Sequence, residues 1–247
     1  MKILVCIAQV PDTTAKISFT DGNTKFDLNG VTMIINPYDE WYALVRALEL
    51  KESGKASEIH LITVGEQAAE ATMRKALALG GDQAFRINAS TDDTFQIAAN
   101  IADFAKEKGY DLILTGKESI DYNNASVGGL IAGLLGYTYE GFATKLEIDG
   151  STATVSREIE GGTQTDKVNL PAVISCQKGM AEARIPNMKG IMSARTKPLT
   201  VSEPTATDAL TEIVKYELPP AKSGVKLFTI DQLDDLVAAL HNEAKVL

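Results

Sequence analysis

Continuous apolar runs alternate with helical patterns along the first 115 residues. Apolar runs predict strands at 2–9, 58–64, 84–87 and 112–115. Apolar positions at helical spacing predict helices at 38–52, 68–79 and 93–106. Strands that are apolar throughout are typical of a parallel sheet covered on both faces. We therefore predict an α/β fold of three layers, a parallel sheet between helices, with the carboxyl ends of its strands along one edge.

Other parts of the sequence predict antiparallel hairpins in addition to the parallel sheet, and an extended arm near the C-terminus. Residues 15–35 contain the turn signal Asp21-Gly22-Asn23, which predicts a hairpin, and Asp149-Gly150-Ser151 predicts another between strands at 144–148 and 153–158. Residues 197–224 hold four of the eight prolines, so we expect an extended arm, followed by a helix with an apolar stripe. The predicted division is an α/β domain at 1–196 and an arm with a terminal helix at 197–247.

The composition of the chain disfavours several classes of partner and site. The chain has 247 residues, 45% of them hydrophobic, and a net charge of −9, which disfavours nucleic acid as a partner. No apolar run approaches the roughly 20 residues of a membrane-spanning helix. Cys6 and Cys176 lie singly in apolar runs, and His60 and His241 are far apart, so we expect a cytoplasmic protein with reduced thiols and without a metal site.

The segment from Gly116 to Gly129 follows the apolar strand at 111–115 and opens a helix. A loop of Gly, Asn, Ser and Asp at a helix start offers free N–H groups and the positive end of the helix dipole to a phosphate. The same composition also suits an ordinary capped helix. Walker, Gly-x-Gly-x-x-Gly and Gly-x-Ser-x-Gly motifs are absent, which disfavours an ATPase, a dinucleotide-dependent dehydrogenase and a hydrolase.

Several short motifs, taken in order, resemble the β subunit of the electron transfer flavoprotein family. They are Gln9-Val10-Pro11-Asp12, Asn36-Pro37, Thr63-Val64-Gly65, Ala78-Leu79-Gly80-Gly81-Asp82, the loop after Thr115, Arg157-Glu158-Ile159-Glu160-Gly161-Gly162, Leu170-Pro171-Ala172-Val173 and Ser223-Gly224-Val225-Lys226. The resemblance implies an adenine-nucleotide-binding fold and a heterodimer whose α subunit carries FAD. This chain would then be an electron-carrier subunit without catalytic residues of its own, holding a structural AMP.

The resemblance also implies particular site residues. By position, AMP would be bound by Cys6, Asn36, Pro37, Tyr38, Asp39, Val64, Gly116, Lys117, Ser119, Ile120, Asp121, Asn123, Asn124, Ser126, Val127 and Gly128. Residues 179–196 are similar to the family's recognition loop, which would dock dehydrogenases such as acyl-CoA dehydrogenases. Its docking residues would be Arg184, Ile185, Met188, Ile191 and Met192, with Met188 as the anchor. The arm and terminal helix would pack on the α subunit, and a membrane quinone oxidoreductase is an implied acceptor.

Two alternatives remain at this point. Some relatives bind a second FAD in place of AMP and bifurcate electrons; Tyr122-Asn123-Asn124 and the Arg157–Gly162 motif favour AMP. The other alternative is a stand-alone nucleotide-binding enzyme of the same α/β type. It would need a pyrophosphate-binding loop near the first strand, and Ala8-Gln9-Val10-Pro11-Asp12 does not provide one.

Overall fold

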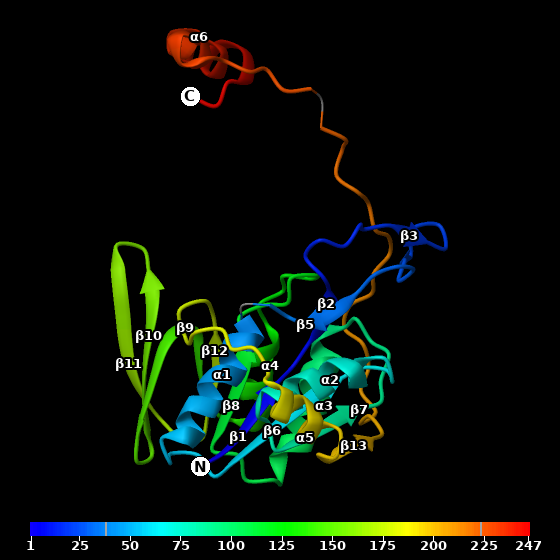
Figure 1. Cartoon of the computed structure of the whole chain (residues 1–247), viewed down its shortest axis with the longest axis vertical. Helices are drawn as coiled ribbons and strands as arrows, with labels where there is room; N and C mark the ends of the chain where they lie inside the picture. The colour runs from blue at the N-terminus through cyan, green and yellow to red at the C-terminus, as the bar shows by residue number, and fades with distance from the viewer. Residues whose placement is uncertain (38, 223) are drawn as a thin grey trace. The chain divides into compact units, whose positions relative to one another are not determined.

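A nine-stranded sheet organises the computed structural model, which describes residues 1–37, 39–222 and 224–247 (Figure 1). The strand order is β11-β10-β9-β12-β8-β1-β6-β7-β13. The strands are β1 (Lys2–Cys6), β6 (Glu58–Val64), β7 (Gln83–Ile87), β8 (Leu112–Gly116), β9 (Thr138–Asp149), β10 (Thr152–Ile159), β11 (Gly162–Asn169), β12 (Ala172–Cys176) and β13 (Leu199–Ser202). From β9 to β13 every neighbouring pair is parallel, which confirms the predicted parallel sheet.

Helices connect the central strands. They are α1 (Asp39–Glu52), α2 (Ala69–Leu79), α3 (Thr94–Lys106), α4 (Val127–Leu135) and α5 (Met188–Ala194). The chain runs from β1 through β6 to β7 on one side and then returns to place β8 on the other side of β1. The strand order therefore reverses between β1 and β8, and ligands of open α/β sheets bind beyond the carboxyl ends of such a pair.

Side chains of the central strands alternate between two cores, as the period of a strand requires. On β1, Ile3 and Val5 pack with residues of α1 and α2, whereas Leu4 and Cys6 pack with residues of α3 and α4. All four β1 side chains are at most 6% exposed. Helices thus cover both faces of the sheet. Because β1 is packed on both sides, the position of its carboxyl end is well defined.

The antiparallel additions are also present. β9, β10 and β11 form consecutive antiparallel pairs, and β12 then returns parallel between β9 and β8. In the insertion, β3 (Phe19–Thr20) pairs with β4 (Lys25–Phe26), and β2 (Gln9–Pro11) pairs with β5 (Met33–Ile35). The parallel placement of β9 beside β12 was not expected, because the pattern of 144–158 indicates hairpins alone.

The chain divides into two compact units at Lys215, later than the boundary expected at residue 197. The first unit includes β13 and continues over α3, where the Asp93 carboxylate accepts hydrogen bonds from Thr211 N at 2.8 Å and Thr211 Oγ1 at 2.6 Å. The second unit, Tyr216–Leu247, contains η1 (Ile230–Gln232), α6 (Leu233–Ala239) and η2 (Leu240–Ala244). In the described part of the chain, no helix has the length and apolar character needed to cross a bilayer.

Candidate functional site

The predicted nucleotide site lies at the edge where β1 and β8 end. β8 ends at Gly116, and the loop 117–126 leads from it to α4. Cys6 ends β1 and Val64 ends β6, so both residues lie at the carboxyl edge of the sheet. Pro37 precedes α1 at the same edge, whereas Tyr38 lies outside the described residues. The structure therefore brings the start of α1 and the loop together from distant parts of the sequence.

Asn36 joins these two segments. Its side chain is fully buried, its Nδ2 donates to the Glu118 carbonyl at 2.8 Å, and its Oδ1 accepts from Ile120 N at 3.1 Å. An ordinary helix cap would bond the N–H groups of its own helix. Asn36 instead fixes the backbone of the loop, including Ser119 between its two partners.

Two acidic residues at the start of α1 accept hydrogen bonds from backbone N–H groups at this edge of the sheet, one in the loop and one just after β1. Glu40 is buried and accepts a hydrogen bond from Ala8 N at 2.7 Å, and Asp39 accepts from Glu118 N at 3.3 Å. Burial raises the pKa of Glu40 to about 8, with a smaller contribution from the negative charges of Asp39 and Asp121. Burial also raises the pKa of Asp39, although the bond from Glu118 N opposes it.

Gly116 allows this close approach. A Cβ at Gly116 would lie 2.7 Å from Glu40 Cγ and 3.1 Å from Asp39 Cβ. Any side chain at this position would force α1 and the end of β8 apart. The glycine that the sequence indicates as a phosphate-loop residue therefore has a packing role in this structure.

The start of α4 has features of an anion site. Ser126 precedes the helix but its side chain makes no capping hydrogen bond, and the first turn has no acidic residue. Beside this turn, the Thr115 hydroxyl is buried and has no hydrogen-bond partner among the described residues. A Cβ at Gly128 would lie only 2.8 Å from that hydroxyl oxygen. Uncapped N–H groups beside a buried unpaired hydroxyl are polar groups that a bound phosphate can satisfy.

Other loop residues have partners away from this turn. Lys117 Nζ forms an ion pair with Glu118 at 2.8 Å, so its charge is already balanced. The Asn124 side chain donates to Thr94 Oγ1 on α3 at 2.9 Å. Asp121 and Asn123 are exposed, and Asn123 has a positive φ of 52°. Of the side chains expected to bind phosphate, Lys117 and Asn124 are thus engaged within the protein.

A cavity of about 480 Å³ adjoins the loop. It is lined by Asp39, Lys117, Glu158, Gln177, Lys178 and Gly179. Glu158, from the Arg157–Gly162 motif, and Lys117, from the loop after β8, thus line the same cavity.

Sequence reasoning did not identify Glu40 and Thr115. Glu40 is an acidic residue in the first turn of a helix, where the helix dipole alone explains its presence. Thr115 belongs to an apolar strand and has ordinary β propensity. Only the folded structure shows that both are buried beside the loop. Their burial could not be predicted from their positions in the sequence.

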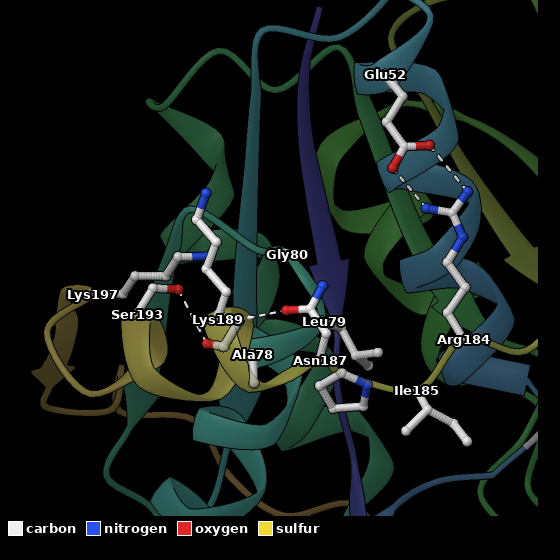
Figure 2. A pocket seen from close by; sticks show the side chains of 12 residues that line it. Glu52, Ala78, Leu79, Gly80, Arg184, Ile185, Asn187, Lys189, Ser193 and Lys197 are labelled. Atoms are coloured by element: carbon white, nitrogen blue, oxygen red, sulfur yellow. Dashed lines mark hydrogen bonds and ion pairs between the residues drawn. The ribbon is translucent and has the colours of Figure 1, made fainter.

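The predicted docking residues form a second cluster, around α5. Arg184 makes a bidentate ion pair with Glu52 at the end of α1, with distances of 2.7 and 3.0 Å, as Figure 2 shows. A cavity of about 380 Å³ lies between this pair, the end of α2 and α5. Four neighbouring apolar side chains are exposed, namely Ile185 (91%), Met188 (72%), Ile191 (42%) and Met192 (65%). Arg184 therefore has an internal partner, and the apolar side chains provide the free surface.

Comparison with known proteins adds an independent result. Residues 24–207 match the model of the electron transfer flavoprotein domain. The chain is 40% identical to the electron transfer flavoprotein subunit beta of Syntrophomonas wolfei, over 92% of this chain and 90% of that protein. Subunits of the same name from Bacillus subtilis (37%) and Homo sapiens (29%) match over 100% of this chain and 100% and 99% of their own lengths.

Proposed function

This chain belongs to the electron transfer flavoprotein family, as a β subunit, and we propose that it binds AMP as a structural ligand and docks dehydrogenases for the FAD of its α subunit. As a family member it is an electron-transfer subunit and not an enzyme with its own substrate reaction. The family also implies an α-subunit partner. The nucleotide, the dehydrogenases and a membrane quinone oxidoreductase as acceptor are parts of the proposal.

One observation carries the nucleotide proposal. The first turn of α4 has no side-chain cap, and the buried Thr115 hydroxyl beside it has no partner within the described chain. In this proposal the phosphate accepts hydrogen bonds from the N–H groups of Val127 and Gly128, and the Thr115 hydroxyl donates a further hydrogen bond to it. The loop backbone is held for this purpose by Asn36.

We prefer AMP to a second FAD because Tyr122-Asn123-Asn124 and the Arg157–Gly162 motif resemble the single-flavin relatives more closely than the bifurcating ones. Charge does not separate the two ligands. The phosphate monoester of AMP is almost doubly ionised at neutral pH, and each of the two phosphate groups of FAD is singly ionised, so the two ligands carry similar charge.

The test is to identify the bound nucleotides of the assembled heterodimer. The chain is co-expressed with its α subunit, the complex is denatured, and the released nucleotides are separated by chromatography. One FAD and one AMP per heterodimer is the expected result. Two FAD molecules would establish the bifurcating alternative, and FAD without an adenine nucleotide in this subunit would refute the site.

The docking proposal rests on the exposed apolar side chains around Met188. Methionine is flexible and polarisable, which suits contact with several different partners. Electron donors would be dehydrogenases such as acyl-CoA dehydrogenases. The second unit, with exposed Leu227, Ile230, Leu233 and Val237, would pack on the α subunit. Both described cysteines are free and buried, which suits the cytoplasmic location that we propose.

A further inference from the structure

The loop between β8 and α4 has an unfavourable backbone conformation at two of its residues. Asn123 has a φ of 52° and Ala125 a φ of 49°. Left-handed conformations are unfavourable for residues with a Cβ atom, and asparagine tolerates them better than alanine does. Such a backbone persists only where surrounding contacts hold it. Contacts with other parts of the protein must therefore hold this part of the loop.

Two side-chain hydrogen bonds attach the loop to the start of α3. Tyr122 Oη donates to Asp92 Oδ1 at 2.8 Å. Asn124 Nδ2 donates to Thr94 Oγ1 at 2.9 Å. Tyr122 and Asn124 lie on either side of the left-handed Asn123, so the two bonds hold the loop where its backbone is unfavourable. We call these two bonds the α3 contacts.

The start of α3 is a firm point of attachment. Asp93, which lies between the two partners of the loop, is 4% exposed, and its Oδ1 accepts from Gln96 N at 2.7 Å and caps the helix. Its Oδ2 accepts from Leu210 N at 3.1 Å and from Thr211 N and Oγ1 at 2.8 and 2.6 Å. The α3 contacts thus join a strained loop to a helix end that is itself well fixed.

The loop is attached to both helical layers of the fold. Asn36, just before α1, holds the backbone at residues 118 and 120, and the α3 contacts hold residues 122 and 124. α1 and α3 pack on opposite faces of the sheet, so the loop crosses the carboxyl end of β8 from one layer to the other. The uncapped start of α4, where the phosphate is proposed to bind, follows directly.

The two attachments differ in burial. The Asn36 side chain is fully buried, whereas Tyr122, Asn124 and Asp92 are exposed. Local opening begins at exposed contacts with little packing around them, because these have the lowest opening free energy. The loop is therefore expected to open on its α3 side while Asn36 keeps its other side in place.

We propose that Tyr122 and Asn124 are positioning residues that act through α3, holding the loop closed over the phosphate and slowing the release of bound AMP. Asn124 then serves the nucleotide through its bond to Thr94, in place of the direct contact expected from the sequence. The inference rests on the proposed AMP function and specifies what controls release of the ligand.

The test measures exchange of AMP in the purified heterodimer. The AMP-loaded complex is mixed with excess tritium-labelled AMP, and protein-bound label is followed over time after free nucleotide is removed. Asn124→Ala and Thr94→Val each remove the same hydrogen bond, so we expect each to speed exchange by about three- to tenfold. The double variant should match the faster single variant within about twofold, because residues that share one bond are not additive. Thr94→Ser keeps the hydroxyl and should keep exchange slow.

Tyr122→Phe and Asp92→Ala form a second pair, for which we expect the same result. The controls are Asn29→Ala, which removes an exposed amide that donates to Asp27 at 2.8 Å in the insertion, and Tyr137→Phe, which removes a hydroxyl just beyond the far end of α4. Both controls should leave exchange within about twofold. All variants change side chains that are at least partly exposed, so their melting temperatures should stay within about 3 °C of wild type.

Three results would contradict the proposal. Faster exchange in Asn124→Ala with wild-type exchange in Thr94→Val, or additive effects of the two, would show that Asn124 acts on the nucleotide directly. Unchanged exchange in all four single variants would show that the α3 contacts do not control release, while the nucleotide site itself would stand. A wild-type heterodimer that neither contains AMP nor takes it up would refute the proposed nucleotide and this inference with it.

Discussion

Asn36 and Glu118 are 82 positions apart in the sequence and are joined by a 2.8 Å hydrogen bond from the buried Asn36 amide to the Glu118 carbonyl. The same side chain accepts from Ile120 N. Because both bonds go to backbone groups, the hold of Asn36 on the loop does not depend on which side chains Glu118 and Ile120 carry. This relationship connects the start of α1 to the proposed nucleotide site.

Replacing Asn36 should therefore disturb both stability and binding. Asn36→Ala removes the hydrogen-bond partner of two partly buried backbone groups, which costs up to about 1–3 kcal/mol each, so we expect lower thermal stability and at least about tenfold weaker AMP binding. Isothermal titration calorimetry and thermal melting of the heterodimer measure these effects. Asn29→Ala, at an exposed asparagine of the insertion, should change neither.

Two glycine-to-alanine substitutions on α4 distinguish an effect on the nucleotide site from an effect on the stability of the helix. Gly128→Ala would bring Cβ to 2.8 Å from Thr115 Oγ1 and 3.0 Å from Tyr139 Cε2, whereas a Cβ at Gly133 meets nothing within 4 Å. We expect Gly128→Ala to release the nucleotide, and Gly133→Ala to retain it and add about 0.5–1 kcal/mol of stability. Nucleotide content after purification decides the matter, and nucleotide retained in both variants would contradict the position of the phosphate.

Thr115→Val distinguishes a ligand contact from a structural hydroxyl. The substitution keeps the side-chain shape and removes a buried hydroxyl that has no partner within the described residues. We expect the nucleotide-free protein to be as stable as wild type or more so, by up to about 1 kcal/mol, and AMP to bind about three- to tenfold more weakly. A loss of stability in the nucleotide-free protein with unchanged AMP affinity would show that the hydroxyl is structural.

Glu40 should make stability depend on pH. Its folded-state pKa of about 8 lies above the ordinary value of 4.5, so the folded protein binds the extra proton. Its contribution to stability is greatest below about pH 4.5, falls as the pH rises, and reaches its full penalty above about pH 8. Glu40→Gln should raise stability at pH 9 by about 1–3 kcal/mol and flatten the decline between about pH 4.5 and 8. Parallel melting profiles of the two proteins would refute this role.

The anchor residue can be tested by a pair of substitutions. Met188 is 72% exposed, so neither Met188→Glu nor Met188→Leu should change folding or bound nucleotide. We expect Met188→Glu to slow flavin reduction by a partner dehydrogenase about tenfold or more, because it places a charge in an apolar pocket, and Met188→Leu to remain within about threefold. Stopped-flow measurement of both variants provides the comparison, and unaltered kinetics of Met188→Glu would reject the anchor.

Much of the fold could be predicted from the pattern of apolar residues. The strands β1, β6 and β8 are mostly apolar because helices cover both faces, and this signal is local. β7 is less regular, because it also contains Gln83 and Arg86. The parallel position of β9 next to β12 and the inclusion of β13 in the sheet depend on pairing between distant segments. Local patterns carry no information on such pairing.

The candidate site shows the same division. The loop after Thr115 could be identified from its composition and from its place after a strand. The partners of Lys117 and Asn124 could not, because ion pairs and side-chain hydrogen bonds depend on neighbours that folding brings close. The buried states of Glu40 and Thr115 have the same origin, and they account for the clearest electrostatic and hydrogen-bonding features of the site.

Residues 177–198, which include the proposed docking residues, connect β12, near the middle of the sheet, to β13 at its edge. Both ends of this segment are therefore attached to the same sheet. A dehydrogenase bound to this segment, as we propose, would therefore move together with the sheet. The motion that brings two redox centres within range for electron tunnelling would then have to arise elsewhere in the assembly.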